Sequence, residues 1–198
     1  MNKSTQIGGH HGRFFHPYQY RGVTVTELIV VISLTGLLSA ATIPSFTQFT
    51  LERRINSAVN ALYTDLFFAR TEALKRWQFV IVCRSVGGEN CDGDAWSYGW
   101  IVFVDENRNN QRDETETVLR FQQRFANSTG VEFGAVTSDY LRYRPDGTGW
   151  PNGTFTFCDR RGTADARAVI FFQNGRPRIS RTRSDGTPLD CSWFPNAL

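Results

Sequence analysis

Residues 21–46 read RGVTVTELIVVISLTGLLSAATIPSF, and this stretch decides how the chain is organised. From Leu28 to Ile43 it carries no charged residue and few polar ones. A helix over residues 23–43 would be roughly 30 Å long at ~1.5 Å per residue, which is enough to span the hydrocarbon of a bilayer. The stretch therefore predicts a membrane-spanning helix near the N-terminus.

The helical pattern resumes after Pro44, where we expect a kink because proline removes one backbone hydrogen bond. Apolar residues then recur at spacings of three and four, while charged residues occupy the other faces. The apolar positions are Ile55, Val59, Leu62, Leu66, Ala69, Ala73 and Trp77. This second half of the helix is amphipathic, so it should lie against a partner.

That partner is expected to be a sheet, because short runs of β-branched and aromatic residues follow the helix. The runs cover residues 79–83, 100–104, 118–121, 154–158 and 168–172. Asn174-Gly175 stands between the last run and Arg176-Pro177-Arg178-Ile179, and Asn-Gly between strands is a strong hairpin signal. The expected fold is α+β, with a long helix packed on an antiparallel β-sheet.

Histidine usage argues against an enzyme. All three histidines, His10, His11 and His16, precede Gly22, so a chain that begins at Val23 has none. Nucleophilic sites built on Ser/His/Asp or Cys/His, and metal sites with histidine ligands, all require an imidazole. We predict no enzymatic activity and no cofactor.

Charge is unevenly distributed, although the formal net charge is only +3. Residues 89–116 are acidic, whereas residues 167–183 hold five arginines and no carboxylate. A locally basic surface is therefore expected on a chain that is not basic as a whole.

The cysteines are four in number, widely spaced, and contain no C-x-x-C pair. This pattern suits two disulfides formed in an oxidising compartment better than a zinc site. The positions are Cys83, Cys91, Cys158 and Cys191.

Glu27 stands beside the apolar run, where an acid costs about 3 kcal/mol by insertion scales. A snorkelling acid at the membrane edge is one interpretation. With Arg21-Gly22 before it and Pro44 after it, however, the context resembles the prepilin family, whose leader ends in glycine and whose glutamate follows the cut. The resemblance implies that a membrane aspartyl peptidase cuts between Gly22 and Val23 and methylates the new N-terminus. It also implies that Glu27 pairs with the terminal amine of a neighbouring subunit.

The resemblance divides the chain into three parts. Residues 1–22 would be the leader, residues 23–50 the transmembrane and filament-core helix, and residues 51–198 a periplasmic globular domain that includes the amphipathic half of the helix. The expected location is the bacterial inner membrane, crossed once, and then a filament of other pilins.

Beyond the helix, the chain resembles the GspH/FimT group of minor pilins and pseudopilins. The matching residues are Ile81-Val82-Cys83-Arg84, Cys91, Gly99-Trp100-Ile101-Val102-Phe103, Asp105, Asn107 and the C-terminal cysteine pair. We predict a Cys83–Cys91 bridge that closes a short loop and a Cys158–Cys191 bridge that ties the C-terminal tail to the sheet.

The element Gly175-Arg176-Pro177-Arg178 matches the GRxR pattern of DNA-binding FimT proteins. On a strand, Arg176 and Arg178 would share one face about 7 Å apart, a spacing that suits successive phosphates. Pro177 lacks an N–H and predicts an edge strand. The arginines at positions 181 and 183 would extend the charge.

This reading makes the chain a minor pilin that binds DNA without sequence preference for uptake in natural transformation. Two alternatives stay open. The arginines could only keep an edge strand soluble. The chain could also be a GspH-type minor pseudopilin of the type II protein secretion system.

A second motif lies in residues 105–116, which match the EF-hand pattern D-x-[DN]-x-[DN]-G-x5-E except that Asn110 replaces the glycine. Strands are expected on both sides, and Arg108 and Arg112 would oppose a cation. We therefore favour a polar hairpin loop over a calcium site. The weak calcium candidates are Asp105, Asn107, Asn109, Asp113 and Glu116.

Overall fold

The structure is a computed structural model that describes residues 22–125, 129–137 and 139–195, without the side chains of residues 40–45. The chain divides into two units, Met1–Pro44 and Ser45–Leu198. Of the leader predicted over residues 1–22, all but Gly22 lies outside the described residues.

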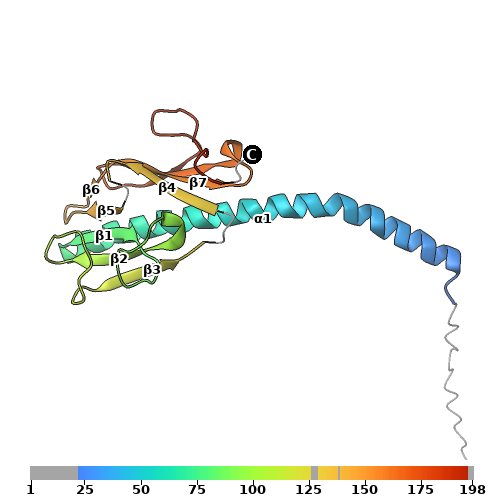
Figure 1. The fold of residues 1–198 in the computed structure, drawn as a ribbon, viewed down its shortest axis with the longest axis horizontal. Coiled ribbons are helices and arrows are strands. Elements are labelled where there is room, and N and C mark those ends of the chain that lie inside the picture. The colour runs from blue at the N-terminus through green and yellow to red at the C-terminus, as the bar shows by residue number, and fades with distance from the viewer. Residues whose placement is uncertain (1–21, 126–128, 138, 196–198) are drawn as a thin grey trace, which may run out of the picture. The chain divides into compact units, whose positions relative to one another are not determined.

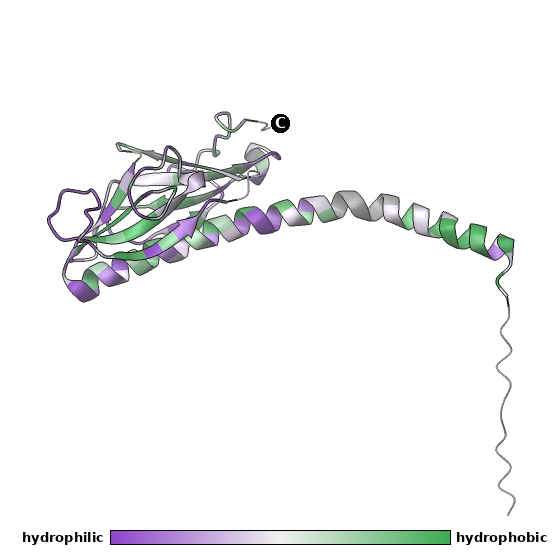
Figure 2. Cartoon of the chain, turned by 60° about the horizontal axis from the view of Figure 1, so that its bottom comes forward, coloured by the Kyte–Doolittle hydropathy of each residue, from purple (hydrophilic) through white to green (hydrophobic). Residues whose placement is uncertain are grey.

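A single helix, α1 (Val25–Arg76), contributes to both units. Its helical backbone continues through Pro44, so the proline costs a hydrogen bond without ending the helix. In the first unit the large apolar side chains between Leu28 and Leu38 are all more than half exposed. Figure 2 shows this part of α1 in the green of hydrophobic residues.

No helical segment among the residues with described side chains is both long and apolar enough to cross a membrane. The span predicted over residues 23–50 includes residues 40–45, whose side chains lie outside the described part of the chain.

In the second unit, α1 buries the stripe that the sequence predicted. The predicted members Ile55, Val59, Leu62, Leu66, Ala69 and Ala73 are at most 2% exposed, and Ala58, which was not predicted, is buried with them. Trp77 is the exception, because it lies just past the end of α1 with a φ of 55° and its side chain is 76% exposed. The left-handed backbone at Trp77 turns the chain out of the helix, so this ring leaves the stripe.

The strands form two antiparallel sheets (Figure 1). The first has the order β3-β2-β1-β5-β6, with bounds β1 Phe79–Arg84, β2 Gly99–Asp105, β3 Val118–Gln123, β5 Tyr140–Tyr143 and β6 Gly149–Trp150. The second has the order β4-β7-β8-β9, with bounds β4 Thr129–Ala135, β7 Gly153–Asp159, β8 Arg167–Phe171 and β9 Arg178–Ser180. Two short 3-10 helices, η1 (Trp96–Tyr98) and η2 (Thr163–Asp165), lie between strands. The α+β prediction is confirmed.

The core of the second unit joins the buried stripe of α1 to both sheets. Aromatic rings fill much of it: Phe133 stacks on Phe155 with ring centroids 4.0 Å apart, and Tyr143 meets Phe171 edge-on at 5.3 Å. Each large side chain buried in this way contributes about 1.5–3 kcal/mol of transfer free energy. The helix is therefore held by packing rather than by its own propensity.

One buried acid links α1 to the first sheet. The Trp100 indole donates a hydrogen bond of 2.9 Å to Asp65, and Arg120 forms an ion pair of 2.7 Å with the other carboxylate oxygen. The Arg120 guanidinium also lies 3.8 Å from the centroid of the Phe68 ring. Asp65 thus has partners on both β2 and β3, and the Phe68 ring helps to hold the Arg120 guanidinium in position.

Candidate nucleic-acid interface

The arginines singled out by the sequence lie on and around β9, which is the edge strand of the second sheet. β9 pairs with β8 in an antiparallel hairpin, with Ile170 opposite Arg178 and Ala168 opposite Ser180. The predicted hairpin and the edge position are both present. Its connection, residues 172–177, is wider than a two-residue Asn-Gly turn.

Arg176 is not on the strand, and this corrects the predicted alternation of Arg176 and Arg178 on one strand face. β9 begins only at Arg178, and residues 176 and 177 belong to the connection. Pro177 is buried while Arg176 and Arg178 are exposed. The backbone leaves the extended path because Gly175 has a φ of 71°.

Gly175 is required there by its surroundings as well as by its backbone. A Cβ at this position would collide with the carbonyl oxygen of Gly147. That same oxygen accepts a hydrogen bond of 3.0 Å from Nε of Arg70 on α1, and the Gln173 carbonyl accepts one of 2.9 Å from the N–H of Gly149. The connection is therefore packed against both the β5–β6 turn and α1, which fixes where Arg176 emerges.

The four arginines at positions 176, 178, 181 and 183 are all exposed. Across the described parts of the chain, none of them forms an ion pair within 4.0 Å. Arg178 lies over the ring of Phe172, 5.7 Å from its centroid. Three of the four, Arg176, Arg178 and Arg181, can therefore bind an anion.

The positive charge of Arg183 is partly balanced by two nearby carboxylates, those of Asp185 and Asp190. The pKa of Asp185 lies below its usual value chiefly because the Thr187 hydroxyl donates to it at 2.6 Å, and Arg183 lowers that pKa further. The pKa of Asp190 is likewise lowered, first by the Ser192 N–H and to a lesser extent by Arg183. Arg183 therefore faces two carboxylates and is the weakest anion ligand of the four.

Arg167 does not belong to this surface, although it lies in the basic stretch of the sequence. It is buried and forms an ion pair of 2.7 Å with Glu52 on α1. Glu52 also pairs with Arg161 at 3.0 Å, and chiefly this contact lowers the pKa of Glu52 to about 2. Arg161 in turn holds Asp159 at 2.7 Å. Sequence reasoning missed this network because Glu52 lies more than 100 residues before Arg161 and Arg167 in the chain.

The predicted processing and assembly residues lie at the start of α1. Gly22 and Val23 are exposed and precede the helix, and among the described residues, chain neighbours aside, no atom lies within 4 Å of a Cβ built at Gly22. Glu27 is in the first turn, where a carboxylate opposes the positive end of the helix dipole. Its N–H donates to the Thr24 hydroxyl at 3.3 Å, which caps the helix.

Backbone N–H groups of the loop between β2 and β3 donate hydrogen bonds to two of the loop's own carboxylates. The Asp105 carboxylate accepts the N–H groups of Asn109 and Asn110 at 3.1 and 3.2 Å, and the Glu116 carboxylate accepts those of Glu106 and Asp113 at 2.8 and 3.0 Å. Burial raises the pKa of Asp105, and these N–H groups oppose that rise.

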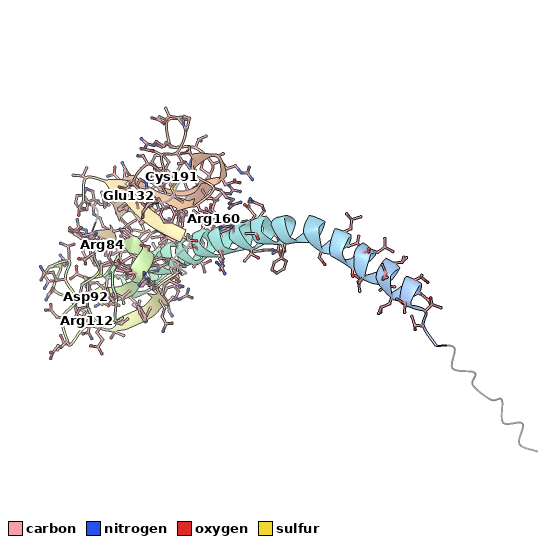
Figure 3. All side chains as sticks on the ribbon, turned by 45° about the vertical axis from the view of Figure 1, so that its right-hand side comes forward. Arg84, Asp92, Arg112, Glu132, Arg160 and Cys191 are labelled. Carbon is pink, nitrogen blue, oxygen red and sulfur yellow. A yellow bond between two sulfur atoms is a disulfide. The ribbon has the colours of Figure 1, made fainter. Side chains whose placement is uncertain are left out.

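The weak calcium candidates are three carboxylates and two asparagines, and Asn107 and Asn109 both donate to the Asp113 carboxylate, at 2.6 and 2.8 Å. In the described residues, no three His, Cys, Asp or Glu side chains are placed to hold a metal ion. Arg112, labelled in Figure 3, donates across the loop to the Glu116 carbonyl at 3.4 Å. The segment forms a polar hairpin loop, and we do not propose calcium binding.

Two disulfides, Cys83–Cys91 and Cys158–Cys191, have Cα atoms 5.5 and 5.8 Å apart, and both pairs are those expected from the sequence. Cys191 is labelled in Figure 3. Its bond places the C-terminal segment against the second sheet, where Leu189 packs with Ala168 and Ile170.

Comparison with known proteins bears on most of the chain. Residues 58–175 match the family described as type II transport protein GspH. The pilin-like protein PilA1 of Thermus thermophilus is 28% identical over 163 residues, which cover 80% of this chain and 97% of that protein.

Two solved structures are similar to parts of this chain. The type IV minor pilin FimU of Pseudomonas aeruginosa matches with a TM-score of 0.53 and 22% identity, over 72% of this chain and 98% of that one. The minor pseudopilin EpsH of the Vibrio cholerae type 2 secretion system matches with a TM-score of 0.46 and 14% identity, over 64% of this chain and 96% of that one. The likeness to FimU supports the α+β fold described above.

Proposed function

Because this chain belongs to the GspH family of type II transport proteins, as a minor pilin or pseudopilin, we propose that it binds DNA non-specifically for uptake in natural transformation. Its role is that of a filament subunit rather than an enzyme. The site is the arginine edge, which we define as Arg176, Arg178, Arg181 and Arg183 on and beside β9.

The proposal includes how the subunit reaches the filament. A prepilin peptidase cuts between Gly22 and Val23, and residues 23–50 hold the mature subunit in the inner membrane before it joins other pilins. The exposed apolar side chains from Leu28 to Leu38 support this, since such a surface needs lipid or other helices to cover it. In the filament, Glu27 pairs with the terminal amine of a neighbour.

Processing is tested on the native protein. Intact mass and peptide mass spectrometry should find Val23 as a methylated N-terminus. Assembled protein that still carries residues 1–22 would contradict the proposal. Glu27→Ala should insert into membranes at least as well as the wild type, because a buried acid is removed, but should be depleted from filaments.

The observation that carries DNA binding is the set of four exposed guanidiniums on and beside the edge strand β9, none of which forms an ion pair with a residue that the structure describes. Arginine is well suited to phosphate because its planar fork can donate two hydrogen bonds at once. None of the four is held in a fixed pattern that would read base edges, so phosphate contact should dominate and sequence preference should be absent. We expect a Kd of ~10⁻⁶ to 10⁻⁴ M at physiological salt, in the range of non-specific binding.

The test uses the full chain in non-ionic detergent and two fluorescent 30-base-pair duplexes of unrelated sequence. Arg176→Ala/Arg178→Ala should weaken binding to both duplexes by the same factor. The matched control, Arg108→Ala/Arg112→Ala, removes two arginines from the acidic β2–β3 loop and should leave binding unchanged. Wild-type protein that binds neither duplex at low salt, or a double variant that binds as well as the wild type, would refute the proposal.

The alternative is a GspH-type minor pseudopilin of type II protein secretion. One observation favours it: the family match ends at Gly175, so all four arginines of the arginine edge lie beyond the matched residues. If DNA binding fails, a secretion assay on a strain lacking this subunit becomes the informative experiment. Lost export of a type II substrate, with wild-type transformation, would establish the alternative.

A further inference from the structure

A groove with a volume of about 390 Å³ lies between α1 and the connection that precedes β9. We call it the aromatic–arginine groove, and its lining residues are Tyr63, Phe67, Arg70, Arg176 and Pro177. Phe67 is 54% exposed, so its ring is accessible to a ligand. The groove therefore combines an accessible ring with one of the arginines already assigned to DNA.

The groove is held by rigid contacts. Arg70 is fixed by its hydrogen bond of 3.0 Å to the Gly147 carbonyl, and Pro177, which also lines the groove, is buried. Gly175 packs on that same carbonyl oxygen, and the Arg176 N–H donates to the Asn174 side chain at 3.0 Å. Arg176 is thus set beside the rings of α1 by the backbone that carries it.

The same pairing of a ring with an arginine occurs a few residues further on. Phe172 is 37% exposed, and the Arg178 guanidinium lies 5.7 Å from its centroid. Both arginines that we assign to phosphate therefore have an exposed phenyl ring beside them. A site for duplex phosphates alone has no use for rings, because the bases of a duplex already stack on one another.

We propose that the aromatic–arginine groove binds unpaired bases, so that the chain prefers single-stranded DNA to duplex DNA. In this arrangement a base stacks on Phe67 while Arg176 and Arg178 contact the flanking phosphates. Alternation of basic and aromatic side chains along a groove is the common means of binding single strands without sequence preference. The inference rests on the proposed function, since it assigns the form of DNA that the same arginines bind.

The expected size of the effect follows from one stacked base. Base–aromatic stacking gives a single strand an advantage of about tenfold in Kd. Phe67→Ala should remove most of that advantage and leave duplex affinity unchanged. Phe67→Leu keeps apolar volume but lacks a flat ring, so it should behave like the alanine variant. Since Phe67 is more than half exposed, neither change should lower the melting temperature appreciably.

The experiment measures binding of the full chain in detergent to labelled oligo-dT of 20 nucleotides and to a 20-base-pair duplex at the same salt concentration. Trp77→Ala is the matched control, because Trp77 is an exposed ring that follows α1 and is not part of the groove. We expect about tenfold tighter binding of oligo-dT by the wild type and the Trp77 variant, and nearly equal affinities for both Phe67 variants.

Other outcomes separate this inference from the proposed function. Equal affinities of the wild type for both forms of DNA, unaffected by Phe67→Ala, would overturn the single-strand inference and leave DNA binding intact. No binding to either form would overturn both. A Phe67→Ala variant that binds DNA as the wild type does but is lost from filaments would show that a second pilin covers the groove, and this too would overturn the inference.

Discussion

Gly175→Ala is the substitution that best tests how the arginine edge is built. Two costs add at this position. A φ of 71° disfavours any residue with a Cβ by about 1–2 kcal/mol, and the new methyl group would strike the Gly147 carbonyl that also accepts from Arg70. Displacing that carbonyl would cost roughly another 1 kcal/mol for the hydrogen bond. The total should be about 2–3 kcal/mol, with Arg176 moved from its place.

Gly186→Ala separates these two costs. Gly186 has a φ of 86°, but nothing lies within 4 Å of a Cβ built there, so only the backbone cost applies. Alanine also reduces the entropy of the unfolded chain, and this effect cancels between the two variants. Gly175→Ala should therefore be less stable than Gly186→Ala by roughly 1 kcal/mol or more. For a chain of this size that corresponds to roughly 2–4 °C in melting temperature.

The assay follows unfolding of the full chain in detergent by the fluorescence of the buried Trp96 and Trp100. Duplex binding is measured on the same samples below the transition. Gly175→Ala should lose affinity because Arg176 is displaced, whereas Gly186→Ala should not. If the two variants have the same melting temperature and the same affinity for the duplex, the connection before β9 is not packed on Gly147. The proposed positioning of Arg176 by that contact would then be wrong.

Three further predictions concern stability. Loop length gives about 2.5 kcal/mol for Cys83–Cys91 and about 4 kcal/mol for Cys158–Cys191, so serine variants of the second pair should melt at the lower temperature. Free thiols in the native oxidised protein would contradict both bridges. The pKa of Glu52 is lowered to about 2 in the folded chain. The ionised carboxylate therefore contributes fully to folding stability above about pH 4.5, and this contribution is lost as the pH falls through 2. Acid titrations of stability should show this loss in the wild type but not in Glu52→Gln. Asp65→Ala leaves the buried Trp100 N–H without its acceptor, so it should lower the free energy of unfolding, measured by thermal melts, by about 2–3 kcal/mol. A decrease below about 0.5 kcal/mol would show that this hydrogen bond is dispensable.

Much of the fold could be predicted because its signals are local. The stripe on α1 follows from the 3.6-residue period, and strong β-formers mark the strands β1, β2, β3, β7 and β8. Three strands were missed. The sequence of β4, TGVEFGA, contains two glycines, whereas β5 has only four residues and β6 only two. The division into two sheets depends on pairing between distant residues, which no local pattern records.

The candidate site was predictable in composition but not in geometry. Arg178, on β9, lies where edge-strand reasoning placed it, because proline marks strand edges. Arg176 does not, since the tertiary contact of Gly175 with Gly147 overrides the local hairpin signal. Sequence reasoning missed Phe67 because Phe67 and Arg176 come near each other only when α1 packs on the second sheet. Exposed aromatic residues on an otherwise amphipathic helix are the one sequence signal that could have indicated the groove.

The salt dependence of duplex binding tests the central claim most directly. Each duplex phosphate that an arginine neutralises contributes roughly 0.9 to the slope of log K against log salt. Arg176→Ala/Arg178→Ala should therefore reduce the magnitude of the wild-type slope by about 1.8, with the melting temperature nearly unchanged. A double variant with the wild-type slope would show that these guanidiniums do not contact phosphate, and the chain would then be better explained as a secretion pseudopilin.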